Sequence, residues 1–383
     1  MGESERRGLA VRQAEPADRE EMMDVLGRAF AGPDGRQSDF WTIHPQLFTD
    51  ERMGDHLLCV EDRRIVGCVG LYPYDVRVRG LLMRAAGLGQ VGTLPEHRGR
   101  GVMSTLLRAA CEQADAQQYA FVWLGGDRLR YGRYGWATGG ARMRFGFRKR
   151  YLPDPPPESA VRPLDAAGDS GLLMRYAAAD TDTVVAVERE LAPVLSAEGA
   201  GGWVLRESLV AYRRGVTNVY LGYGQPDEVL ALLAHHLRWV VAREEGHEGI
   251  SVECPVAPST LMDVCVRNYE GVSLVPSGMF RTGPLARFLK VACRVAQPQV
   301  EAGSGRVALC NAETGETATV VCRDGELSVE QGGGDAFALN RRDLSEVCFG
   351  LCPLDVLLPG LPAGSFLRRV LPLPVYWSRF FGV

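Results

Sequence analysis

The segment Arg98-Gly99-Arg100-Gly101 stands directly before a run whose apolar residues recur at helical spacing, from Val102 to Ala114. Glycines ahead of a helix leave backbone N–H groups free to face anionic oxygens, and the helix dipole adds to the attraction. The residue types and their order therefore predict an anion site at the start of this helix. The plainer alternative is a tight strand-to-helix turn that uses glycine only for its backbone freedom.

Two common glycine motifs do not fit this loop. A dinucleotide-binding fingerprint needs a third glycine where Ser104 stands, and a Walker loop needs a Gly-Lys-Ser/Thr sequence that is absent here. The anion is therefore expected to belong to another class of ligand.

The elements that would position this loop are two strands and the helix between them. Residues 86–93 are rich in glycine with apolar residues at alternate places, which predicts a strand that can be bulged or closely approached. Pro95 ends it. Residues 120–124 form a fully apolar run, which predicts a second, buried strand that ends at Gly125-Gly126.

The order Val91-x-Thr93-x-Pro95-x-x-Arg98-Gly99-x-Gly101-Val102 resembles the acyl-coenzyme A loop of the GNAT N-acetyltransferases. The resemblance implies that the strand before the loop is splayed from its neighbour and pairs with the pantetheine arm. It also implies that Val91 and Thr93 hold the acetyl end, with the Val91 N–H stabilising the developing oxyanion. Many such loops carry Gln or Arg where this chain has Glu96, so cofactor affinity does not transfer directly.

Tyr131 lies in the run Tyr-Gly-Arg-Tyr-Gly-Trp, where the same family keeps a general acid for the departing thiolate of coenzyme A. A phenol has an ordinary pKa of about 10 and is protonated at neutral pH, so it can donate a proton. The alternative for Tyr131 is a packed aromatic side chain with a satisfied hydroxyl. For Tyr134 and Trp136 we favour that packing role.

Composition sets bounds on the rest. The chain has 383 residues, more than one core usually supports, and its net charge of −4 argues against nucleic acid as the main partner. No run of about 18 apolar residues and no apolar leader occurs, so we expect no membrane partner and a cytoplasmic location. The ten cysteines show no metal-binding spacing, and no metal is expected.

We expect an α/β (α+β) chain of tandem GNAT-like mixed-sheet domains followed by a sterol carrier protein-like α+β domain. Residues 142–147 alternate in polarity and are predicted to close the first domain as an edge strand. Pro153-Asp154-Pro155-Pro156-Pro157 is a stiff linker. The predicted domains are a catalytic domain at 1–152, a degenerate copy without the Arg-Gly-x-Gly loop at 153–284, and the carrier-like domain at 285–383.

This succession resembles the Eis family of acetyltransferases. The resemblance implies acetyl-CoA as co-substrate, a small-molecule amine acceptor and a trimer-based homo-oligomer, possibly a hexamer. It implies a catalytic role for Tyr131, for the Val91 N–H and for the terminal carboxylate of Val383, which would orient the amine and relay its proton through water. The cofactor contacts that it implies are Val91, Thr93, Arg98, Gly99, Arg100, Gly101, Val102 and Gly126.

The acceptor is less defined. Aminoglycoside-acetylating members carry acidic residues at places that here hold Gly32 and Gly382, although Asp34 and Asp39 could compensate. The aromatic residues Phe40, Trp41 and His44 could line the acceptor pocket or fill the core. An alternative function is a lipid or small-ligand binding protein that works through its C-terminal domain with a vestigial coenzyme A site. A narrower alternative is acetylation of a protein lysine or N-terminus.

Overall fold

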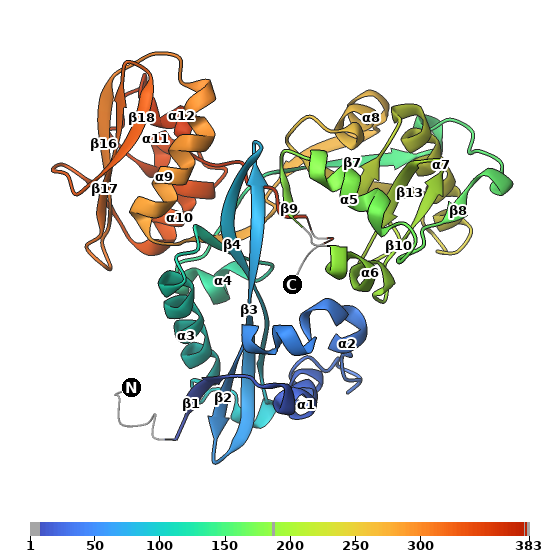
Figure 1. Ribbon diagram of the computed structural model, residues 1–383, viewed down its shortest axis with the longest axis horizontal. Coiled ribbons are helices and arrows are strands. Elements are labelled where there is room, and N and C mark those ends of the chain that lie inside the picture. The colour runs from blue at the N-terminus through green and yellow to red at the C-terminus, as the bar shows by residue number, and fades with distance from the viewer. Residues whose placement is uncertain (1–7, 186–187, 379, 381–383) are drawn as a thin grey trace.

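The computed structural model describes residues 8–185, 188–378 and 380. Within these residues the strands form three sheets of eight, seven and four strands, called here the first, second and third sheets. Figure 1 shows the first domain, in blue to blue-green, with its long β3–β4 hairpin rising between the second domain, in green and yellow, and the third, in orange and red.

The first sheet has the order β1-β2-β3-β4-β5-β15-β6, and β9 pairs with β3 outside that path. One face is covered by α1, and the other by α3. The strands are β1 (Ala10–Gln13), β2 (His56–Glu61), β3 (Arg64–Val78), β4 (Leu81–Thr93), β5 (Phe121–Leu124), β6 (Ala137–Gly139), β9 (Thr183–Val185) and β15 (Gly278–Thr282). The helices of the first domain are α1 (Arg19–Ala29), α2 (Phe40–Ile43), α3 (Val102–Ala116) and α4 (Arg128–Tyr131).

The second sheet has the order β14-β7-β13-β12-β11-β10-β8. Its strands are β7 (Arg142–Arg148), β8 (Arg162–Pro163), β10 (Gly201–Leu205), β11 (Ser208–Tyr212), β12 (Asn218–Tyr223), β13 (Gly249–Pro255) and β14 (Gly271–Val275). Its helices are α5 (Ser170–Ala179), α6 (Glu188–Ser196), α7 (Pro226–Val241) and α8 (Thr260–Asn268). β12, α7 and β13 follow one another as strand, helix and strand, and the two strands pair in parallel.

The third sheet has the order β18-β17-β16-β19 and packs against α9, whose apolar face is buried. The hairpin between β17 and β18 turns at Asp324 and Gly325, both with positive φ, as the Asp-Gly pair predicts. The strands are β16 (Gly305–Asn311), β17 (Thr317–Arg323), β18 (Glu326–Gln331) and β19 (Phe337–Leu339). The helices are α9 (Leu285–Ala296), α10 (Arg341–Phe349), α11 (Leu354–Leu357) and α12 (Leu367–Val370).

The first two domains exchange strands. β7 was expected at the edge of the first domain, but it lies inside the second sheet, between β13 and β14. In return, β15 enters the first sheet between β5 and β6. The prediction for residues 142–147 was therefore wrong about their sheet, because alternating polarity specifies a strand with two unlike faces but not its partner.

The first domain also contacts the second through the tip of its long hairpin. Arg77 on β3 donates to main-chain carbonyls at the end of α5, including that of Asp180. The Asp180 carboxylate accepts a hydrogen bond of 2.5 Å from the Tyr223 hydroxyl. Burial raises the pKa of Asp180 from 3.8 to about 6, although the Tyr223 bond and the Arg77 charge act in the opposite direction.

This pKa predicts a pH-dependent stability at the hairpin contact. Since the folded-state pKa is raised, the native chain holds this proton more tightly than the unfolded chain, so the contribution is present below about pH 4 and lost as pH rises through about 6. The variant Asp180→Asn keeps an acceptor for Tyr223 without the charge. Between pH 4 and about pH 6, the melting temperature of the variant should rise relative to that of the parent. From about pH 6 to pH 8 the difference should stay constant. A constant difference across this range would contradict the assignment, and Asp62→Asn, at an exposed turn, serves as control.

A second contact joins the first domain to the third. The Asp115 carboxylate on α3 accepts two hydrogen bonds of 2.8 Å from Arg281 on β15 and one of 2.9 Å from Arg341 on α10. The Arg281 side chain is only 1% exposed, whereas that of Asp115 is 32% exposed. Asp115 is thus the carboxylate that compensates a buried cation on the exchanged strand.

Loss of this carboxylate is expected to destabilise the chain. Asp115→Asn leaves the Arg281 guanidinium buried without its ion-pair partner, a cost of about 2–3 kcal/mol. Thermal unfolding should show a lower midpoint for this variant. Glu330→Gln is the matched control, because Glu330 pairs with two arginines whose side chains are more than half exposed, and such surface pairs contribute little. Equal effects of the two substitutions would disprove the role given to Asp115.

Candidate active site

The predicted anion loop has the backbone that such a site needs. Gly101 is the N-cap of α3 with φ +87°, and Gly99 has φ +77°. A Cβ at either position would meet no atom within 4 Å, so these glycines are needed for their backbone conformation and not for space. The first N–H groups of α3 have no acceptor within the helix and are available to an anion.

The two arginines of the loop fasten it to neighbouring elements. Arg98 donates to the carbonyl of Ala29, the last residue of α1, at 2.9 Å. Arg100 donates to the Glu61 carboxylate at 2.5 Å, and His97 lies 3.3 Å from the same carboxylate. Both arginines therefore help to position the loop and also give it positive charge.

β4 separates from β5 next to this loop. The two strands are parallel and pair only at Ala86↔Val122 and Gly87↔Trp123. Among the described residues, the remainder of β4 up to Thr93 has no partner in β5, and Val91 and Thr93 lie in this part of the strand. Its backbone can therefore pair with an extended ligand.

A bulge lies in the same part of β4. Gly92 pairs with Cys68 and Gly89 with Gly70, so Gln90 and Val91 both stand opposite the single residue Val69. Gln90 has φ +48°, a conformation that costs a non-glycine residue about 1–2 kcal/mol. The bulge directs Gln90 toward the face that carries α1, where it contacts Tyr72, and Val91 toward the cluster that contains Val102 and Leu106.

Tyr131 ends α4 on the α3 face of the sheet and is 7% exposed. Its ring lies against Gly126, where a Cβ would be 2.4 Å from a ring carbon, so the glycine makes room for the tyrosine. Burial raises the pKa of Tyr131 above 10, and the phenol is protonated at neutral pH. Trp136 is fully buried, and the Tyr134 hydroxyl donates to Ser104 at 2.8 Å, which fits the packing role expected for these two residues.

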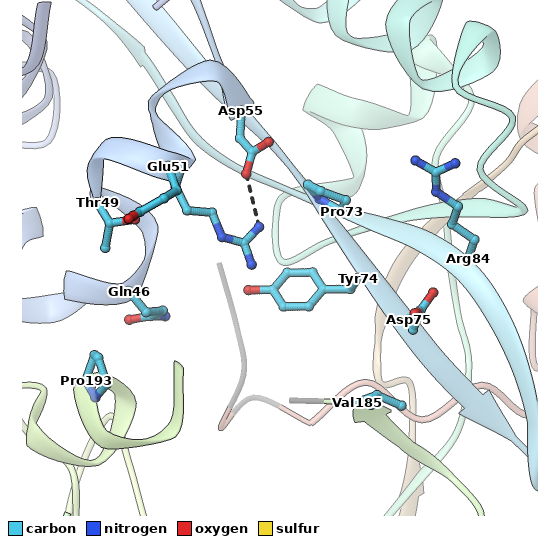
Figure 2. A pocket seen from close by; sticks show the side chains of 11 residues that line it. Gln46, Thr49, Glu51, Asp55, Pro73, Tyr74, Asp75, Arg84, Val185 and Pro193 are labelled. Carbon is cyan, nitrogen blue, oxygen red and sulfur yellow. Dashed lines mark hydrogen bonds and ion pairs between the residues drawn. The ribbon is translucent and has the colours of Figure 1, made fainter. Parts of the chain in front are cut away.

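A cavity of about 620 Å³ lies on the other face of the sheet, between the first and second domains. Figure 2 shows Tyr74 projecting into it, with the segment that carries Thr49, Glu51 and Asp55 on one side and Pro193 on another. The lining residues are Gln46, Thr49, Glu51, Arg52, Asp55, Pro73, Tyr74, Asp75, Arg84, Val185 and Pro193.

The cavity wall carries three carboxylates and two guanidiniums. Arg52 forms an ion pair of 3.0 Å with Asp55 and lies over the Tyr74 ring, with 5.6 Å between its Cζ atom and the ring centroid. Asp75 stands opposite Arg84 in the β3–β4 ladder, and both side chains line the cavity. These formal charges sum to −1, a small excess of negative charge on the wall.

The C-terminal segment packs beside this cavity. The Trp377 ring stacks on that of Trp123, with centroids 4.8 Å apart, and contacts the Tyr74 ring edge-on at 5.5 Å. The carbonyl of Phe380 accepts a hydrogen bond from Arg213, a buried residue that follows β11. Trp123 is where β5 last pairs with β4, so the tail covers the sheet where the strands separate.

The described residues that the sequence predicted for the site lie on the α3 face of the first sheet or at its separated strands. The structure places Val91 and Thr93 on the separated part of β4, and Val102 and the loop glycines at the start of α3. Gly126 follows β5 and lies against the ring of Tyr131, which ends α4. Neither Tyr131 nor Val91 lines the cavity, because both belong to the α3 face. Val383 lies outside the described residues.

The sequence missed the cavity wall. Phe40 and His44 are buried, Trp41 is 45% exposed, and none of the three lines the cavity. Neither Asp34 nor Asp39 lines the cavity. The Asp39 side chain caps α2, and the Asp34 side chain accepts a hydrogen bond from the Arg36 N–H. The charged cluster 50–55 was the available signal, but it is assembled into a wall only by β3 and the second domain.

A comparison with protein families decides the class of the first domain. Residues 10–139 match the family model described as "Acetyltransferase (GNAT) domain". This segment is a GNAT domain. No curated protein matches the chain significantly.

Solved structures share the fold of nearly the whole chain. A GCN5-related N-acetyltransferase from Kribbella flavida is 18% identical, with coverage of 96% of this chain and 98% of that chain at a TM-score of 0.64. One from Anabaena variabilis is 12% identical, with the same coverages and TM-score. Eis1 from Mycobacterium abscessus is 16% identical, covers 98% of this chain and 99% of that chain, and has a TM-score of 0.62. The likeness confirms the expected Eis-like architecture around the GNAT domain.

Among the described residues, no three His, Cys, Asp or Glu side chains are grouped so that they could hold a metal ion. Within the same part of the chain, none of the helices combines the length and the apolarity that crossing a bilayer requires.

Proposed function

We propose that the chain is an acetyl-CoA-dependent N-acetyltransferase that acetylates a primary amine by direct attack. The proposal rests on the separation of β4 from β5, because the two faces of the first sheet carry different groups at this place. On one face lie the anion loop and Tyr131; on the other lies the acidic cavity. A thioester lying between the strands would be reached by an amine from the cavity.

The residues of the GNAT domain fit the co-substrate. The N-terminus of α3, with Gly99 and Gly101, would bind the pyrophosphate, and the unpaired backbone of β4 would hold the extended arm. Acetyl-CoA supplies an acetyl group activated as a thioester. The Val91 N–H would face the carbonyl oxygen on which negative charge develops.

Two proton transfers complete the proposed reaction. The amine nitrogen forms a bond to the carbonyl carbon and the carbon–sulfur bond breaks, so the sulfur leaves with the electron pair. Tyr131 would give its proton to that sulfur, since its raised pKa keeps the phenol protonated. The proton lost by the amine would pass through water to the Val383 carboxylate. The contact of Trp377 with Tyr74, which lines the cavity, and the burial of Phe380 support this role for the tail.

The first test measures thiol release from acetyl-CoA against a panel of amines, aminoglycosides and lysine peptides. Tyr131→Phe removes the proton donor and keeps the ring, so kcat should fall by about 10²–10⁴-fold. Deletion of Val383 should lower turnover as well, with coenzyme A binding retained by calorimetry. Tyr119→Phe, at another buried ring whose hydroxyl bonds to Gln117, is the matched control.

Absence of turnover on every acceptor, together with absence of coenzyme A binding, would exclude the transferase. The alternative of ligand binding through the third domain would then gain weight. The acceptor profile also tests the narrower alternative, because turnover on lysine peptides but not on small amines would favour a protein acceptor.

The charge of the cavity predicts a preference for cationic acceptors. Asp75→Asn removes an exposed lining carboxylate, and the KM for a diamine or polyamine should rise about 2–5-fold, the effect of one exposed ion pair. The KM for acetyl-CoA should not change. Glu207→Gln, which alters an exposed carboxylate outside the cavity, is the control. An unchanged KM for polyamines would show that the wall does not select charge.

A further inference from the structure

Three buried polar side chains connect the cavity wall to the bulge on β4. The Tyr72 hydroxyl lies 2.9 Å from His56 Nε2 and 2.5 Å from Gln90 Oε1. His56 Nδ1 in turn lies 3.2 Å and 3.3 Å from the carbonyls of Arg52 and Met53. Tyr72 and His56 are fully buried and Gln90 is 6% exposed. We call this chain of contacts the His–Tyr–Gln network.

The protons of the network can be assigned from its ends. Carbonyls only accept, so His56 Nδ1 carries a proton, and burial lowers the His56 pKa to about 4, which leaves Nε2 an acceptor at neutral pH. Tyr72 has a single proton and donates it to Nε2. The Tyr72 oxygen can then accept from the Gln90 side chain, provided that its terminal amide turns the N–H₂ group and not Oε1 toward the hydroxyl. In this arrangement each of the three groups has a partner.

The strand is shaped to admit the network. Gly70 stands two residues before Tyr72 on β3, and a Cβ at Gly70 would lie 2.1 Å from the Tyr72 hydroxyl oxygen. Glycine at this position is thus required by the position of Tyr72, and it has an ordinary negative φ. The hydroxyl occupies the space of the missing side chain and reaches Gln90 there.

We propose that Tyr72 is a positioning residue that, through Gln90, holds the β4 bulge and so fixes the direction of the Val91 N–H. Gln90 is a non-glycine residue in the left-handed region, and only surrounding contacts keep such a residue there. Its neighbour Val91 points to the opposite face of the sheet. At the other end, His56 follows the 3₁₀ segment η4 (Asp50–Asp55), whose side chains line the cavity. The network therefore connects the cavity wall to the part of β4 that carries the Val91 N–H.

The inference rests on the proposed function for its catalytic consequence. A displaced oxyanion donor stabilises the transition state less, while cofactor binding stays unchanged. Tyr72→Phe in the full chain should therefore lower kcat about 10–100-fold, with a change of less than about 2-fold in the KM for acetyl-CoA. Tyr119→Phe again serves as control. Gly70→Ala, which displaces the hydroxyl without removing it, should reproduce the effect.

A double-mutant cycle tests the route of the effect. Gln90→Gly abolishes the contact with Tyr72, and glycine adopts the left-handed conformation without cost. In that background Tyr72→Phe should cause little further loss of kcat, because both substitutions remove one contact. Additive losses would overturn the proposal, as would a kcat for Tyr72→Phe equal to that of Tyr119→Phe.

Hydrogen exchange separates this inference from the proposed function. The amides of residues 88–93 should exchange faster in Tyr72→Phe than in the parent and in Tyr119→Phe, whether or not the chain shows turnover. Unchanged exchange in this segment would disprove the positioning role even in an active enzyme. Faster exchange with no turnover in the parent would uphold the network and reject the transferase.

Discussion

The pairing of β4 with β5 stops after two residue pairs, and the site depends on that interruption. A parallel sheet normally continues its ladder, since each unpaired backbone group in the interior is unfavourable. Here α3 and its loop lie on one face of the sheet and the acidic cavity lies on the other, so the gap between β4 and β5 connects the two faces. The bulge at Gln90 and Val91 lies within it and directs adjacent side chains to opposite faces.

The first domain could be predicted from the sequence because its signals are local. Gly99 and Gly101 specify a helix N-terminus, and the apolar spacing after Val102 specifies one buried helix face. Tyr131 is a candidate because it begins the run Tyr-Gly-Arg-Tyr-Gly-Trp, and its role as an acid stays a prediction. Each of these inferences needs only neighbouring residues or the short run between two strands.

The cavity and the strand exchange could not be predicted in this way. Glu51, Asp75 and Pro193 line the same cavity although they are far apart in sequence, and no periodicity of the sequence indicates this arrangement. The residues of β7 indicate a strand, yet their choice of β13 and β14 as partners depends on long-range packing. Likewise, Gly70 looks like any strand glycine until the position of the Tyr72 hydroxyl is known.

The exchanged strands also bear on how the chain folds as it is synthesised. β5 ends at Leu124, but its neighbour β15 begins only at Gly278. Between them in the sequence, β7 pairs with β13 of the second sheet. The first sheet therefore keeps an open edge at β5 until the second domain has emerged, because β15, which covers this edge, follows the other strands of both sheets in the sequence. Such long-range pairing slows folding and exposes an unpaired strand. We therefore expect the first two domains to fold as one cooperative unit, although their sheets are separate.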